Sequence, residues 1–485
     1  MIKRNPMVIL ISIMCLIVLT AVFISFYDTN IDESYNVVNN SKDRMSEFKG
    51  VIKLKGRYKE EFEERIVYND AWFTQDSNIY NHNLATSSLY VALSTFSDGD
   101  YSKYWGEKID NIREKNIESV LSNLSFKNAE FKGYSTSLNS SESKVAFGMA
   151  MKSFYVDDLP YNVVCVAIRS GGYGCEWSDN FNVGNEDMEY HKGFYDSALG
   201  VKKALDDYVK RNCNKGNVKF WICGYSRGGA VANILATMID DKSNVYAYTF
   251  ASPNTFCFDD QKMNSYDNIF NIINPYDPVV SLPPAEWGFS KAGRNMYFPQ
   301  NYEKTDEIIT NVYENYYNLT GENDDIYTHS LISDLMDYII SFVDTRKNYS
   351  DNYQNVFQAL AKATLTRTKV LGKWEKIPFE TYIKNTFGKD GSIAIKNFEK
   401  SEHYNSMESV GLSVPELIRQ LDIALRIYGH ESPEKLLFEN MTLDSIDYIN
   451  KMKDNSSFKS LAVGHYPEVY ISWMKSIKYE NFVEK

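Results

Sequence analysis

Apolar residues between positions 145 and 274 fall in short, continuous runs rich in β-branched side chains. Strands that are covered on both faces have this pattern, because neither face meets water. Helix-compatible segments separate the runs, for example 194–210. Strands that alternate with helices predict an α/β fold with a mainly parallel sheet, right-handed crossovers and helices on both faces. The expected strands are 145–151, 161–168, 218–223, 245–250 and 269–274.

The remaining segments suggest how the chain is divided. A helix near residues 83–94 opens the predicted α/β core, which extends over 81–299. Residues 300–460 show mostly helical patterns without a buried strand, which indicates a helical cap or insertion, or an appended helical domain. Residues 461–485 form a short C-terminal return. Residues 30–80 are polar and charged, with a helix-compatible part at 53–65, and are interpreted as a spacer or stalk.

The N-terminal residues 1–29 differ from the rest of the chain. Lys3 and Arg4 precede an apolar run over 7–27 that is long enough to cross a bilayer, and acidic residues follow it. The positive-inside rule then places the N-terminus in the cytoplasm and the bulk of the chain outside the cell membrane. Since no A-x-A cleavage site follows, the pattern favours an uncleaved single-pass anchor over a cleaved signal peptide that would release a secreted protein.

Charge and cysteine content exclude some classes of function. The 52 basic and 64 acidic residues give a net charge of −12, and no basic cluster is present, so nucleic acid is not an expected partner. Five cysteines lie outside the apolar N-terminal run, and none forms a C-x-x-C pair. Neither a disulfide framework nor a zinc site is therefore expected. The oligomeric state stays open.

One turn carries a candidate nucleophile. The apolar run 218–223 ends at Gly224, and a helix of small residues begins almost at once. Ser226 has Gly224 two positions before it and Gly228 two positions after it, which is the spacing of a nucleophile elbow. The alternative is an ordinary strand-to-helix turn. In an elbow, the peptide N–H of Arg227 at the helix start would stabilise an oxyanion.

A serine nucleophile needs a base and an orienting carboxylate, which follow it in the order Asp, His in this type of turn. Asp277 is the best candidate acid, because it follows the strand 269–274 in a loop fixed by prolines. Two histidines beyond it precede helices, His329 and His465. Choosing His465 makes 300–460 an insertion, whereas choosing His329 makes that region a trailing domain. The residue pattern leaves both open.

Four motifs occur together and in a fixed order. They are H-K-G-F-Y at 191–195, G-Y-S-R-G-G-A at 224–230, T-F-A-S-P at 249–253, and the acid loop at 274–284. Together they resemble the class 3 lipases and their bacterial lipase-related relatives. The resemblance covers about residues 80–290 and implies an α/β-hydrolase-type sheet. It also implies a lipid or other carboxylic ester as substrate.

The resemblance also bears on the base. In that family the catalytic histidine often precedes a final short helix with a tyrosine and a tryptophan, similar to His465 followed by Tyr470 and Trp473. This favours His465, with His329 as the alternative. By the same resemblance, His191 is a structural residue at a helix start.

The oxyanion loop departs from the family pattern. The family shows R-G-T, where this chain has Arg169, Ser170 and Gly171, with Trp177 and Asp179 matching further on. Gly171 replaces a hydroxyl residue, so the resemblance implies only its backbone N–H as an oxyanion donor.

Two functions are compatible with these patterns. The first is a lipase-like serine ester hydrolase that forms an acyl-enzyme and needs no metal or cofactor. The second is a non-catalytic, surface-anchored binding or scaffold protein on a degenerate lipase fold, because a fold alone does not guarantee activity.

Overall fold

The computed structural model describes residues 34–39, 42–54, 62–96, 114–134, 145–170, 180, 182–213, 216–300, 306–324, 326, 346 and 463–484. The expected membrane anchor at 1–29 lies outside these residues and stays a prediction. Within the described ranges, no helix combines the length and the apolar character that crossing a bilayer requires.

A mixed sheet forms the centre of the molecule, and its middle strands run parallel. Strand β5 is antiparallel to β6, and β6 through β10 are adjacent and parallel in chain order. Strand β4 (Lys127–Lys132) extends the sheet beside β5, and β11 (Val483–Glu484) does so beside β10, both antiparallel. The expected α/β class is confirmed. The other strands are β5 (Phe147–Val156), β6 (Leu159–Ile168), β7 (Asn217–Tyr225), β8 (Val245–Phe250), β9 (Ile269–Ile273) and β10 (Arg294–Tyr297).

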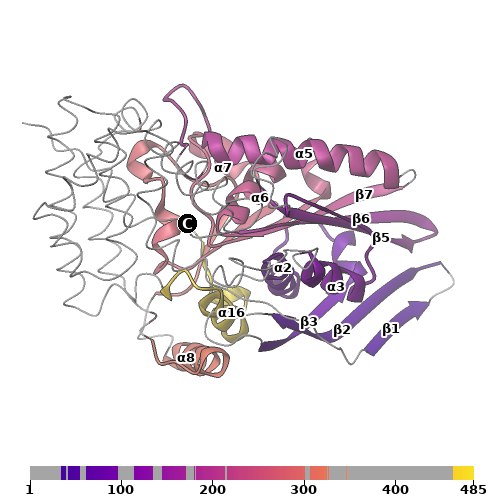
Figure 1. Ribbon diagram of the computed structural model, residues 1–485. Helices are drawn as coiled ribbons and strands as arrows, with labels where there is room; N and C mark the ends of the chain where they lie inside the picture. The colour runs from indigo at the N-terminus through magenta and orange to yellow at the C-terminus, as the bar shows by residue number, and fades with distance from the viewer. Residues whose placement is uncertain are drawn as a thin grey trace, which may run out of the picture.

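Helices cover both faces of this sheet (Figure 1). One face carries α5 (Lys192–Asn212) and α6 (Arg227–Thr237), whose apolar side chains form one buried cluster with the sheet. The opposite face carries α2 (His82–Ser94) and α16 (Pro467–Ser476), which belong to a second, larger cluster. Helix α3 (Lys115–Asn123) lies on the same side as α2.

Residues 34–69 do not form the expected spacer. Strands β1 (Ser34–Asn39), β2 (Arg44–Leu54) and β3 (Phe62–Asn69) pair antiparallel in a small N-terminal sheet that packs on α2. This small sheet is continuous with the central sheet at one point, where Arg44 of β2 pairs antiparallel with Tyr155 of β5. In Figure 1 this sheet lies on the far side of α2 from the central strands. At 53–54 and 62–65, the described parts of the helix-compatible range, the chain forms strand and not helix, so the expectation of a helix is wrong there. Buried positions alternate along β2 and β3 and are mostly apolar, while the positions between them are exposed or half-buried and mostly charged.

An ion pair between a buried carboxylate and a lysine that is 35% exposed joins this small sheet to the C-terminal helix. Glu64 of β3 is buried, accepts a hydrogen bond of 3.0 Å from the Tyr90 hydroxyl, and pairs with Lys475 of α16 at 2.9 Å. The globular part of the chain consequently begins well before residue 81.

The chain returns to the sheet after the region 300–460. Helix α8 (Asp306–Thr320) packs on α16, whereas nearly all of 325–462 lies outside the described residues. Residues 463–484 lie against the sheet through α16 and β11. The remaining short helices are η1 (Asp70–Thr74), η3 (Lys242–Asn244), α7 (Asp260–Asn264), η4 (Pro278–Ser281), η5 (Ala285–Trp287) and η7 (Tyr479–Asn481).

Candidate active site

Ser226 stands at a sharp corner between β7 and α6. Its backbone has φ 54° and ψ −127°, a region that non-glycine residues rarely adopt. The Ser226 N–H donates to the Phe250 carbonyl at 2.8 Å, which ties the corner to the end of β8. A strained backbone persists where its surroundings hold it in place, and such positions concentrate at functional sites.

The glycines around Ser226 allow this corner to form. A Cβ atom added to Gly224 would collide with the carbonyl oxygen of Gly228. A Cβ atom on Gly228 would collide with the carbonyl oxygen of Ile168 at the end of β6. Backbone occupies both places, so a neighbouring side chain could not move aside. The local structure is therefore the elbow that the spacing predicts.

The imidazole of His465 lies between Ser226 and Asp277. Its Nε2 is 2.9 Å from Ser226 Oγ, and its Nδ1 is 2.8 Å from Asp277 Oδ2. Asp277 and His465 are 0% and 1% exposed, and Ser226 is 6% exposed. An ionised carboxylate only accepts hydrogen bonds, so Nδ1 carries the proton and Nε2 is left to accept one from the serine hydroxyl.

Two more donors hold the Asp277 carboxylate. The Tyr470 hydroxyl donates to Oδ2 at 2.8 Å, and the Val279 N–H donates to Oδ1 at 2.9 Å. Burial, followed by the nearby Asp277 charge, raises the pKa of Tyr470 well above its ordinary value, so the phenol keeps its proton. The carboxylate is thus fixed from α16 and from η4 as well as by the imidazole.

The backbone on either side of the imidazole is also fixed. The carbonyl of His465 accepts a hydrogen bond of 2.8 Å from the Tyr225 hydroxyl, next to the elbow serine. The carbonyl of Gly464 accepts one of 2.8 Å from Asn274 Nδ2, at the end of β9. A Cβ atom on Gly464 would collide with the Tyr276 carbonyl oxygen, so this close approach of the two loops needs glycine.

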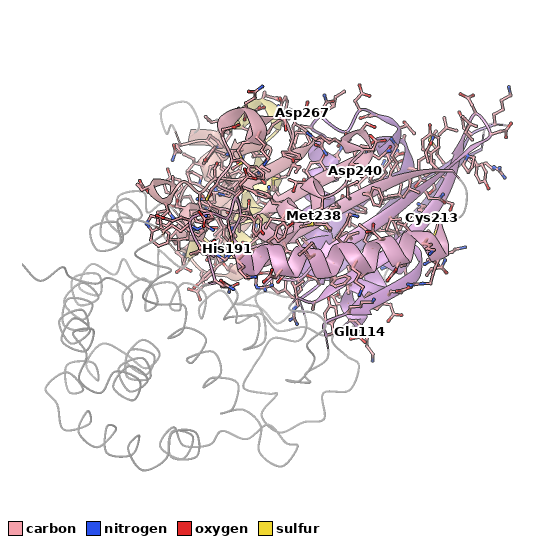
Figure 2. The ribbon with its side chains drawn as sticks, turned by 90° about the horizontal axis from the view of Figure 1, so that it is seen from above. Glu114, His191, Cys213, Met238, Asp240 and Asp267 are labelled. Carbon is pink, nitrogen blue, oxygen red and sulfur yellow. The ribbon has the colours of Figure 1, made fainter. Side chains whose placement is uncertain are left out.

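His191 occupies a different environment. It is fully buried at the start of α5, where Figure 2 shows it at the opposite end of the helix from Cys213. Its ring stacks on Phe194 with centroids 3.9 Å apart, and Nε2 is 3.2 Å from the Asn180 carbonyl. Burial, followed by the charges of Arg346 and Arg227, lowers the pKa of His191 to about 3. The ring is therefore neutral near pH 7.

The structure describes only some of the other candidate residues. Arg227 heads α6, so its backbone N–H belongs to the first turn beside Ser226, while its buried guanidinium donates to Ser197 Oγ at 3.0 Å. His329 and Gly171 lie outside the described residues. In the part of the chain that the structure describes, no group of three or more His, Cys, Asp or Glu side chains is arranged to hold a metal ion.

Asn274 was not singled out from the sequence, although it joins the acid loop to the histidine loop. Besides its bond to Gly464, its Oδ1 accepts from the Tyr276 N–H at 3.2 Å. Its own N–H donates to the Tyr470 hydroxyl at 3.1 Å. One sequence feature does indicate a functional role for Asn274: it directly follows a buried strand. In open parallel sheets, ligands bind at the carboxyl ends of the strands.

A serine elbow on an α/β sheet, with a histidine between the serine and an aspartate, is the arrangement typical of serine hydrolases. The family model described as lipase (class 3) matches residues 171–287, which include Ser226 and Asp277. The resemblance to class 3 lipases is thereby confirmed over this segment.

Solved structures of fungal lipases show a partial likeness. The mono- and diacylglycerol lipase from Aspergillus oryzae is 18% identical, with 46% of this chain and 81% of that chain covered and a TM-score of 0.30. The Rhizomucor miehei lipase propeptide complex is 19% identical, with 45% and 67% covered and a TM-score of 0.28. A search of curated proteins finds no match.

Proposed function

We propose that this protein is a lipase-like serine ester hydrolase that uses Ser226, His465 and Asp277. The observation that carries the proposal is the position of the His465 imidazole, 2.9 Å from Ser226 Oγ and 2.8 Å from Asp277 Oδ2. A serine hydroxyl is a weak nucleophile until a base accepts its proton, and this geometry supplies that base.

The proposed reaction has two halves. Ser226 Oγ attacks the acyl carbonyl carbon while His465 Nε2 takes the hydroxyl proton, and the same proton then passes to the leaving alcohol. Asp277 stabilises the imidazolium that forms between these steps. Water then attacks the acyl carbon while His465 takes one of its protons, the bond to Ser226 Oγ breaks, the proton passes to Oγ, and the carboxylic acid is released. The backbone N–H groups of Arg227 and Gly171 are the proposed oxyanion donors.

A lipid or other carboxylic ester is the proposed substrate class, and no cofactor enters the reaction. The support is the match to the lipase family over the segment that holds the elbow and the acid loop.

A fluorophosphonate probe, which reacts with activated serines, tests the proposal on the full chain in detergent. The wild-type protein should be labelled and Ser226→Ala should not. Ser252→Ala is a matched control, because it removes another buried serine hydroxyl, one that bonds to the Pro253 carbonyl. Labelling of wild type and Ser226→Ala to the same extent, or of neither, would exclude the hydrolase and favour the non-catalytic scaffold.

The identity of the base is tested separately by ester hydrolysis. His465→Ala should reduce the rate to the background of Ser226→Ala. His329→Ala should keep the wild-type rate. The opposite result would assign the base to His329.

We also propose that residues 1–29 anchor the protein in the cell membrane, with the hydrolase domain on the extracytoplasmic side. The support is the apolar run after Lys3 and Arg4. Fractionation of the full chain and of a chain that lacks residues 1–33 tests this, because only the full chain should remain with the membrane after a high-salt wash. A shortened chain in the culture medium from the full-length gene would indicate cleavage.

A further inference from the structure

A buried lysine contacts the acid loop but is not one of the three residues proposed to carry out the reaction. Lys291 lies between η5 and β10, and its side chain is 4% exposed. Its ammonium donates to the Val280 carbonyl and to Asn254 Oδ1, both at 2.6 Å. Within the described ranges it forms no ion pair.

Removing an ammonium group from water costs several kcal/mol, and neutral acceptors offset only part of that cost. Burial accordingly lowers the pKa of Lys291 to about 7, opposed by the attraction of Asp277. An apolar side chain could fill the same space at lower cost. A feature other than packing is therefore needed to explain a lysine here.

The contacts of Lys291 lead directly to Asp277. Asn254, which Lys291 orients, donates its N–H to the Leu282 carbonyl at 2.7 Å and its Nδ2 to the Pro283 carbonyl at 2.9 Å. Lys291 and Asn254 together thus hold three carbonyls of the segment that follows Asp277. Asp277 is tied to the start of the same segment, because its Oδ1 accepts from the Val279 N–H.

We propose that Lys291 is a positioning residue, which keeps the Asp277 carboxylate in line with His465 by fixing the 280–283 segment through Val280 and Asn254. The proposal rests on the proposed hydrolase function. The Lys291 ammonium donates the hydrogen bonds that hold the 280–283 segment. Its positive charge also attracts the Asp277 carboxylate at a distance, without a hydrogen bond to it. A carboxylate displaced by a fraction of an ångström would orient the imidazole less well, since catalysis depends steeply on such geometry.

The test replaces Lys291 with methionine, which keeps the length of the side chain and removes its donors. Lys291→Met should lower kcat for a short-chain p-nitrophenyl ester about 10- to 100-fold and leave KM nearly unchanged. Lys291→Gln keeps one donor for the Val280 carbonyl and should recover part of this loss. The fluorophosphonate labelling rate should fall in parallel with kcat.

Lys152→Met is the matched control. Lys152 is another buried lysine, 8% exposed, but it pairs with Asp70 at 3.1 Å on the side of the small N-terminal sheet. This variant should lower Tm and keep the wild-type kcat. If Lys291→Met loses activity only in proportion to its unfolded fraction, as Lys152→Met would, Lys291 is merely structural and the proposal is wrong.

A second measurement does not depend on hydrolysis. The proton between His465 Nδ1 and Asp277 should give a low-field NMR resonance, which His465→Ala would identify by its loss. Lys291→Met, or Lys291→Gln if the methionine variant does not fold, should shift or broaden this resonance. An unchanged resonance would overturn the positioning role. If the wild-type protein is not labelled by the fluorophosphonate but the resonance still shifts in the Lys291 variant, only the proposed hydrolase function is overturned.

Discussion

The hydroxyl of Tyr470 donates to Asp277 Oδ2 at 2.8 Å, and this is the same oxygen that faces His465 Nδ1. The helix that follows the histidine therefore holds the acid as well. Hydrogen bonds to a buried charge contribute more than neutral ones, about 1.5–3 kcal/mol each. The acid and the imidazole are thus fixed relative to one another by a single short segment of chain.

Tyr470→Phe should lower kcat about tenfold, which corresponds to about 1.4 kcal/mol, because Asp277 loses one of its donors. Steady-state ester hydrolysis and thermal unfolding measure the effect. Tyr316→Phe is a suitable control, since Tyr316 is buried in α8 and donates to another carboxylate, Asp324, at 2.9 Å. The control should lose stability without losing activity, and an equal loss of kcat in both variants would contradict the role of Tyr470.

Gly228→Ala should abolish fluorophosphonate labelling and destabilise the fold by several kcal/mol. The new Cβ would collide with the Ile168 carbonyl oxygen and lie 2.8 Å from the carbonyl carbon of Arg169, and neither can move without distorting β6. Gly288→Ala is the comparison, because a Cβ there meets nothing within 4 Å at φ 84°. It should cost only about 1–2 kcal/mol of left-handed strain and retain labelling.

The buried imidazole of His191 predicts a loss of stability in acid. Its pKa in the folded protein is about 3, below the ordinary 6.5, so the unfolded chain binds a proton more readily. The contribution of neutral His191 to the free energy of unfolding is complete above about pH 6.5 and is lost as the pH falls towards 3. His191→Gln should reduce the slope of unfolding free energy between pH 6 and 4 by up to about 1.4 kcal/mol per pH unit.

Urea unfolding at several pH values measures that slope. The control is Phe194→Leu, which disturbs the ring stacked on His191 without changing a titrating group. It should lower stability equally at all pH values. A slope in His191→Gln equal to that of the wild type would contradict the prediction.

Arg346 is expected to stabilise the loop before α5. Its guanidinium is buried and donates to the carbonyls of Met188 at 2.6 Å, Tyr190 at 2.9 Å and Gly184 at 3.3 Å. Arg346→Met should speed hydrogen exchange over 183–191, as mass spectrometry would detect, because these carbonyls lose a shared donor. Arg211→Met, which breaks an exposed pair with Glu130, should leave that exchange unchanged.

Local patterns in the sequence predicted much of the central fold. The glycines around Ser226 indicate the elbow because the collision they avoid involves backbone only a few residues away or on the adjacent strand. The run 245–250 coincides with β8, because every residue of that strand is buried and no polar position interrupts it. Patterns of this kind need no knowledge of distant residues.

The small N-terminal sheet was missed for a physical reason. Its outward residues, such as Lys49, Lys53 and Glu63, make the mean hydropathy of the segment polar. The buried residues Phe48, Ile52 and Leu54 fall at alternate positions, and this alternation is what indicates a strand. Period-two alternation indicates a half-buried strand even where the mean is polar.

The contacts that support the site could not be predicted from patterns among neighbouring residues. Asn274 and Lys291 act on loops that the fold brings together from distant positions, and only coordinates show which carbonyls they reach. The choice between His465 and His329 likewise rested on a resemblance, because spacing alone does not fix which histidine returns to the sheet.

Ser226 and His465 are 239 positions apart in the chain. During translation, a ribosome that has completed the elbow must still synthesise all of that intervening polypeptide before the imidazole exists. Closing so long a loop is also entropically unfavourable and slow. Nascent and truncated chains would therefore not hydrolyse esters. Hydrolysis would begin only when 463–484 has been synthesised and α16 has packed on the sheet.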